Sequence, residues 1–97
     1  MTPREKKVLG YCNWVRESLG FTPLTELLPG VRHSPWSCPV ANTIRGGPND
    51  SVEISTDRTR YFLNNGMQEF DVNHPKYVSR FVGDFDNGKL PHLEVVE

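Results

Sequence analysis

The sequence predicts a small α+β domain in which helices and an antiparallel sheet pack as two layers. Three observations support this prediction. Apolar residues recur with helical spacing near both ends of the chain, they alternate with polar residues in the middle, and an Asn-Gly pair there is typical of a tight β-hairpin. We expect, in order, an N-terminal helix, a short helix, a three-stranded antiparallel meander and a C-terminal helix. Because 97 residues suffice for one core, we expect a single domain over residues 1–97, with a tail at 89–97.

The first helix is expected from Pro3 to Ser18. The segment Thr2-Pro3-Arg4-Glu5 matches a capping box, in which the first and fourth side chains each accept a hydrogen bond from the other's backbone amide. Proline at the first helical position loses no hydrogen bond, and Gly20 can adopt the left-handed conformation that ends a helix. One face of this helix carries the apolar residues Val8, Tyr11, Cys12, Val15 and Leu19.

The segment from Phe21 to Pro35 has weaker signals. Thr22-Pro23 repeats the pattern of a cap followed by proline, which favours one or two helical turns over residues 24–28. Further along, Ser37 is expected to cap a short helix that continues to Ile44.

Alternating polarity predicts the meander. Residues 52, 54 and 56 share one side of a first strand, residues 56–59 can turn the chain, and residues 60–63 form a second strand. Asn65-Gly66 predicts the next hairpin turn, because both residues tolerate a positive φ. A third strand is expected from about Met67 to Val72.

The C-terminal helix is expected to be capped by Asn73, to open with Pro75 and to end at Gly88. Leucines and valines in the tail at 89–97 suggest that part of the tail packs against the domain. The helix carries an apolar stripe of Val78, Phe81, Val82 and Phe85.

Composition excludes some classes of function. The net charge of -1 gives no overall attraction to nucleic acid or to an anionic membrane. No segment reaches the roughly 18 apolar residues that a membrane span needs, so no membrane partner is expected. The N-terminal segment lacks the apolar stretch of a signal peptide, so we expect the cytoplasm and reduced thiols at Cys12 and Cys38, although their spacing alone leaves a disulfide open.

Cysteine and histidine residues raise two further hypotheses. None of them shows the paired spacing of a zinc site, so we expect no metal and no cofactor. Cys38 lies at the predicted start of a helix, where the dipole favours a thiolate, and His33 nearby could activate it in a thiol-dependent enzyme or redox sensor. We favour the alternative that Cys38 packs inward at a structural corner, so an enzyme is less expected than a non-enzymatic protein.

Two surfaces could bind a macromolecule. Arg58 and Arg60 flank the first hairpin turn with Tyr61 beside them, and an arginine-bearing β-ribbon can enter a nucleic-acid groove. Acidic neighbours dilute this positive charge, so nucleic acid is the less favoured partner.

The tryptophans indicate a protein-binding surface. Trp14 lies off the apolar stripe of the first helix, and Trp36 lies in an irregular segment near Arg32 and His33. Tryptophan is enriched at binding hot spots, which makes these four residues candidate partner contacts. The alternative is that both tryptophans simply close the rim of the core.

Two segments resemble parts of small, uncharacterised proteins of actinobacterial phages and prophages. They are Trp36-Ser37-Cys38-Pro39-Val40-Ala41-Asn42-Thr43-Ile44 and the stretch from Phe81 to Leu93. In that group a Cys-Pro-hydrophobic-Ala segment precedes a strand region, and a Phe-Asp-x-Gly segment leads to Pro-x-Leu. The resemblance carries no catalytic residues, and it implies a short accessory protein made inside a bacterial cell. We therefore expect a phage-type, non-enzymatic protein that binds a host or phage protein.

Overall fold

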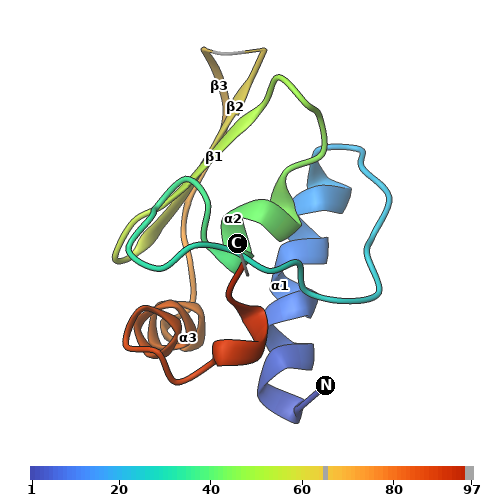
Figure 1. Ribbon diagram of the computed structural model, residues 1–97. Helices are drawn as coiled ribbons and strands as arrows, with labels where there is room; N and C mark the ends of the chain where they lie inside the picture. The colour runs from blue at the N-terminus through green and yellow to red at the C-terminus, as the bar shows by residue number, and fades with distance from the viewer. Residues whose placement is uncertain (65, 96–97) are drawn as a thin grey trace.

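The computed structural model describes residues 1–64 and 66–95, and it confirms the α+β class and the predicted order of elements (Figure 1). A three-stranded antiparallel sheet, in the order β1-β2-β3, follows two helices and precedes a third. The elements are α1 Pro3–Ser18, α2 Pro39–Ile44, β1 Ser51–Ile54, β2 Arg58–Leu63, β3 Met67–Asn73, α3 Lys76–Asp86 and the short 3-10 helix η1 Pro91–Leu93.

Both ends of α1 agree with the prediction. The Glu5 amide donates to the Thr2 hydroxyl at 3.1 Å, and the Thr2 amide donates to the Glu5 carboxylate at 3.2 Å, which completes the capping box. Gly20 has a φ of +85°, so the chain leaves the helix through a left-handed residue.

The expected helical turns at residues 24–28 are absent, and that prediction was wrong. Asn13 of α1 donates to the Leu24 carbonyl at 2.9 Å and accepts from the Leu24 amide at 2.8 Å. The Leu28 amide donates to the Thr43 hydroxyl at 2.9 Å. Side chains of α1 and α2 thus satisfy backbone groups that a helix would otherwise pair, and the segment stays irregular.

The cap of α2 is Cys38 rather than the predicted Ser37. The Cys38 sulfur accepts a hydrogen bond from the Ala41 amide at 3.5 Å, and Pro39 follows at the first helical position. The helix ends at Ile44, as expected. A sulfur cap is a weak one, so the position of this corner depends mainly on packing.

The first hairpin of the sheet has a shorter turn than predicted. The chain turns over residues 56–57, where the Ser55 amide donates to the Arg58 carbonyl at 3.0 Å, so Thr56 lies outside β1 and β2 begins two residues earlier than expected. A register shift between Tyr61 and Phe62 marks a bulge in the β2–β3 pair. The predicted Asn65-Gly66 turn includes Asn65, which lies outside the described residues.

The C-terminal segment packs against the domain as expected. Asn73 stays in β3 and does not cap α3, whose flanking residue is Pro75. After Gly88, the tail runs beside Gly30, whose amide donates to the Leu93 carbonyl at 2.8 Å. The Leu93 side chain is buried.

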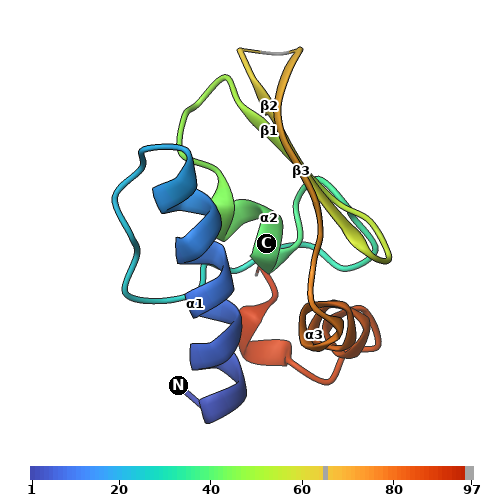
Figure 2. The ribbon, with the colours of Figure 1, turned by 180° about the vertical axis from the view of Figure 1, so that it is seen from behind.

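The core lies between the inner face of the sheet and the helices. Figures 1 and 2 show α1 and α2 on one side of the sheet, with α3 at the end where β3 leaves it. No described helix is long and apolar enough to cross a membrane. The largest fully buried apolar side chains of the core are Tyr61, Phe81, Phe85, Ile44, Val8, Val15, Val40, Val52 and Val78.

Candidate functional site

An open, mainly apolar groove of about 500 Å³ runs between α1 and β3. We call it the α1–β3 groove. The groove lies beside β3, one of the two edge strands of the sheet. The groove is lined by Lys7, Gly10, Tyr11, Trp14, Val72, Asn73, Pro75 and Tyr77.

Trp14 forms the rim of this groove and is 52% exposed. Its ring packs edge to face on Phe70 of β3, with centroids 5.8 Å apart, and lies 6.0 Å from the Tyr11 ring. The sequence places Trp14 off the apolar stripe of α1, and in the structure its ring packs on Tyr11 and Phe70 and leaves half of its surface to solvent.

Lys7 and Tyr77 also line the groove. The Lys7 ammonium lies 4.4 Å from the centroid of the Tyr77 ring, a distance at which a cation and a ring attract. Val72 and Tyr77 were not singled out in the sequence, because their contribution depends on how β3 and α3 dock against α1.

A chain of hydrogen bonds runs from the groove into the molecule. The Tyr11 hydroxyl donates to Thr59 at 2.8 Å, Thr59 lies 3.0 Å from His74 Nδ1, and His74 Nε2 lies 2.9 Å from the Ser79 hydroxyl. Ser79 donates to the Thr56 carbonyl at 2.7 Å. One assignment satisfies every group: Thr59 donates to Nδ1 and the neutral ring donates from Nε2 to Ser79.

That assignment bears on the Ser79–His74 pair, whose spacing resembles that of a nucleophile and its base. The single proton of the Ser79 hydroxyl is given to the Thr56 carbonyl, and the imidazole acts as a donor toward Ser79. Burial lowers the pKa of His74 below 6.5, despite the opposing contact with the Thr56 backbone and the Asp57 charge. The arrangement is therefore that of a structural hydrogen-bond network, which is buried at Thr59 and His74 and reaches the surface at Ser79.

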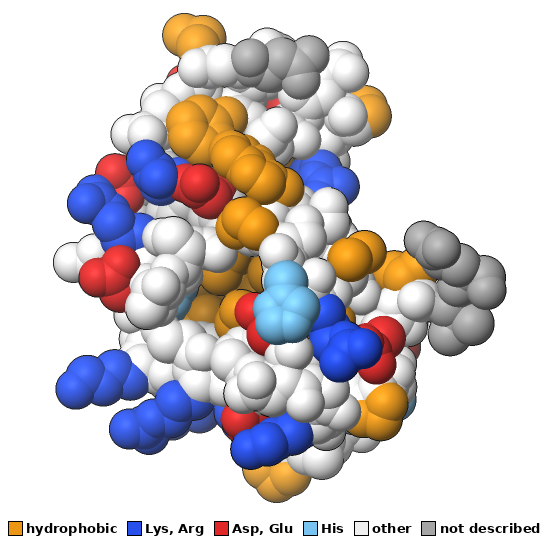
Figure 3. Space-filling model, turned by 60° about the vertical axis from the view of Figure 1, so that its left-hand side comes forward, with side chains coloured by type: hydrophobic (Ala, Val, Ile, Leu, Met, Phe, Trp, Pro, Cys, Tyr) orange, Lys and Arg blue, Asp and Glu red, His pale blue; other side chains and the backbone are white. Residues whose placement is uncertain are grey.

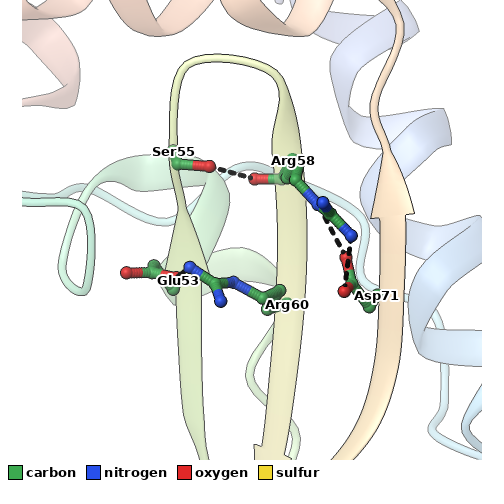
Figure 4. Close-up of polar contacts among 5 residues, drawn as sticks. All are labelled: Glu53, Ser55, Arg58, Arg60 and Asp71. Atoms are coloured by element: carbon green, nitrogen blue, oxygen red, sulfur yellow. Dashed lines mark hydrogen bonds and ion pairs between the residues drawn. The ribbon is translucent and has the colours of Figure 1, made fainter.

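The outer face of the sheet holds Arg58 and Arg60 in ion pairs (Figure 4). Arg58 contacts both oxygens of Asp71, at 3.0 and 2.7 Å, and Arg60 pairs with Glu53 on the neighbouring strand. Each guanidinium is thus engaged by a carboxylate, which reduces the field that a phosphate backbone would meet.

Tyr61 does not belong to that face, and its selection as a nucleic-acid contact was wrong. Side chains alternate along a strand, so Tyr61 points into the core, where it is fully buried. Its hydroxyl donates to Asp50 at 2.7 Å and accepts from the Gly46 amide at 2.8 Å. Alternation from Arg58 and Arg60 was the signal that could have excluded it.

The other three candidate contacts lie away from the α1–β3 groove. Trp36 is 45% exposed and packs on Phe62, which points to the outer face of the sheet, whereas Trp14 lies on the inner side. Arg32 is paired with Glu94, and His33 has a φ of +59°. The structure therefore separates Trp14 from Trp36.

His33 borders a second, more polar cleft of about 530 Å³, which opens on the face shown in Figure 3. The His33 amide donates to Asp86 at 2.9 Å, so this carboxylate orients the backbone rather than the imidazole. Ser79 and Val82 of α3 form its opposite wall.

Cys38 is buried, and burial raises the pKa of its thiol to about 11. An activated nucleophile needs the opposite shift, and the geometry supports the structural corner instead. Cys12 is also buried and free, and burial raises its pKa as well. Within residues 1–64 and 66–95, no group of three His, Cys, Asp or Glu side chains could hold a metal ion.

Comparisons with protein-family models, with curated proteins and with solved structures found no match to this chain.

Proposed function

We propose that this chain is a non-enzymatic binding protein that holds a protein partner in the α1–β3 groove, with Trp14 as the anchor. The observation that carries the proposal is a half-exposed tryptophan at the rim of an apolar groove that exists without the partner. Burying the exposed half of such a ring removes roughly 100 Å² from water, which stabilises a complex by about 2–3 kcal/mol. That is the contribution of a typical hot spot.

The groove also limits the cost of binding. Phe70 and Tyr11 hold the Trp14 ring on two sides, so little rotamer freedom remains to be lost when a partner covers it. The Phe70 and Tyr11 rings can keep their positions when a partner covers Trp14. The proposal does not use Trp36, Arg32 and His33, which stay predictions for a separate surface.

The proposed setting follows from the resemblance to phage and prophage proteins. We take the protein to be a phage-encoded accessory protein of the bacterial cytoplasm whose partner is a host or phage protein. Two free, buried cysteines support a reducing compartment. Nucleic-acid binding has less support, because Arg58 and Arg60 are both paired with carboxylates.

The test compares two tryptophan variants in capture experiments from host lysate. We expect Trp14→Ala to lose the partners that the wild type retains, and Trp36→Ala, which removes an equally large exposed ring, to keep them. Thermal unfolding followed by circular dichroism checks that both variants fold. If folded Trp14→Ala captures the same partners as the wild type, Trp14 is not the anchor and the proposal fails.

A further inference from the structure

We infer that the partner enters the α1–β3 groove as an extended segment that adds a fourth strand to the free edge of β3 and sets a basic side chain against Glu69. The inference rests on the proposed function and names the form and charge of its partner. Three features of β3 carry it: the direction of its backbone groups, the apolar groove on one side of it, and its acidic character.

The hydrogen bonds of the first hairpin determine which backbone groups each strand directs outward. The Ser55 amide bonds to the Arg58 carbonyl, and the Ile54 amide bonds to the Pro35 carbonyl on the far side of β1. Opposite residues in an antiparallel pair alternate between hydrogen-bonded and non-hydrogen-bonded pairs. Ser55 and Arg58 are a bonded pair, so Ile54 and Thr59 are a non-bonded one. The backbone N–H and C=O groups of Thr59, and of every second residue of β2 from it, therefore point toward β3.

On β3, Val72 is opposite Thr59 and bonds to β2. The His74 amide, two residues beyond Val72, donates to the Asp57 carbonyl, so every second residue from Val72 directs its backbone groups toward β2. Asp71 and Asn73 therefore direct their N–H and C=O groups away from the sheet. One backbone bond, from the Ile54 amide to the Pro35 carbonyl, reaches the edge of β1, whereas none reaches the edge of β3 in the described part of the chain.

An added strand would place its side chains in two different environments. Side chains alternate across the strand, so every second one would point toward α1 and meet Val72, Phe70 and Trp14. The others would lie on the outer face. Backbone bonds to the edge then supply affinity, and the groove selects an apolar side chain.

The charge on β3 sets the polarity of the outer side chains. The strand carries Glu69 and Asp71 and no basic residue. Arg58 already holds Asp71, whereas Glu69, exposed beside the bulge, has no ion pair among residues 1–64 and 66–95. A basic side chain of the partner can pair with Glu69 at this exposed site.

The same carboxylates argue against a second copy of this chain as the occupant. If two copies of β3 paired antiparallel with Asp71 at the centre, Asp71 would lie opposite Asp71 of the other copy. If the centre shifted to Phe70, Glu69 of each copy would lie opposite Asp71 of the other. Like charges directly opposite are destabilising. These charges disfavour the two registers of self-pairing named above, and the occupant that we infer is a segment of another chain with apolar and basic residues in alternation.

The test uses two synthetic peptides, Thr-Lys-Val-Lys-Ile-Lys-Thr and its counterpart with Glu in place of each Lys. We expect the basic peptide to bind the wild type at least threefold more tightly than the acidic one, with a preference that shrinks as salt rises. Glu69→Lys should reverse the preference. Glu26→Lys, the same charge change on an exposed residue outside the groove, should leave it unchanged.

Amide hydrogen exchange reports the form of binding. In the complex, the amides of Asp71 and Asn73 should become protected, while that of Val72, already bonded to β2, should change little. Binding that shifts the Trp14 indole resonance without protecting these two amides overturns strand addition. Failure of both peptides to bind, with Trp14-dependent capture intact, overturns this inference and leaves the proposed function standing. If neither peptide binds and capture does not depend on Trp14, both this inference and the proposed function are overturned.

Discussion

At the scale of single residues, position relative to a neighbour decides what a side chain does. Trp14 follows Tyr11 by three residues on α1, so one edge of its ring reaches the core while the other stays in solvent. Cys38 occupies a helix start that could activate a thiol, yet its burial has the larger effect and the pKa rises to about 11. The dipole of so short a helix does not outweigh desolvation.

Alkylation with iodoacetamide measures this balance at Cys38. We expect both thiols of the native protein to be almost unreactive at pH 7, and to react at the ordinary rate once guanidinium unfolds the chain, because burial disfavours the thiolate and blocks access. Cys38→Ser, which leaves Cys12, serves as the control. Rapid labelling of native Cys38 below pH 8 would restore the thiol-enzyme alternative.

At the scale of elements, the acidic side chains of β3 have two effects. An exposed sheet edge invites pairing with other chains, and charged side chains on that edge suppress it. Glu69 and Asp71 discourage self-association of β3, and the same charge selects a basic partner strand. At the other edge, on β1, the Pro35 carbonyl accepts a hydrogen bond from the Ile54 amide.

The end of α1 depends on Gly20, and substitution there tests the local backbone. Gly20→Ala should lower the free energy of unfolding by about 1 kcal/mol, because a φ of +85° strains any residue with a Cβ. Gly10→Ala, in the same helix with open space around its Cβ, should raise it by about 0.5–1 kcal/mol. Urea unfolding measures both changes. Equal effects at the two sites would contradict this account of the helix end.

At the scale of the whole molecule, the buried polar network joins parts distant in sequence. Tyr11 of α1, Thr59 of β2, His74 after β3 and Ser79 of α3 satisfy one another's hydrogen bonds. Because each buried polar group would be costly without its partner, the network favours one way of docking these elements. It also makes the molecule sensitive to the protonation of His74.

Stability should therefore fall as the pH is lowered below about 6.5. The unfolded chain takes up a proton at His74 near that pH, whereas the folded protein, with its lowered pKa, resists doing so until the pH is lower still. Unfolding in urea between pH 7.5 and 5 measures the slope. His74→Gln should flatten it in this window, and an unchanged slope in that variant would refute the role of His74.

Glu5 acts at lower pH and can be separated from His74. Burial raises the pKa of Glu5, but hydrogen bonds from His92 and Thr2 outweigh burial, and the net pKa is lowered from 4.5. Its contribution is present above pH 4.5 and is lost as the pH falls through the folded value. Above pH 5, the change in unfolding free energy with pH therefore comes from His74 and not from Glu5.

The sequence by itself determined the elements and their order, because caps, helix stops and apolar periodicity are local properties. The helix expected at about Pro3 to Ser18 is confirmed, whereas the choice of Trp14 as a partner contact stays a prediction. Only the tertiary structure decided that Asn13 keeps residues 24–28 irregular, that Trp14 meets Phe70 beside a free strand edge, and that His74 joins a buried network. These features depend on contacts between residues far apart in the chain, and a local pattern carries no information about which elements will meet.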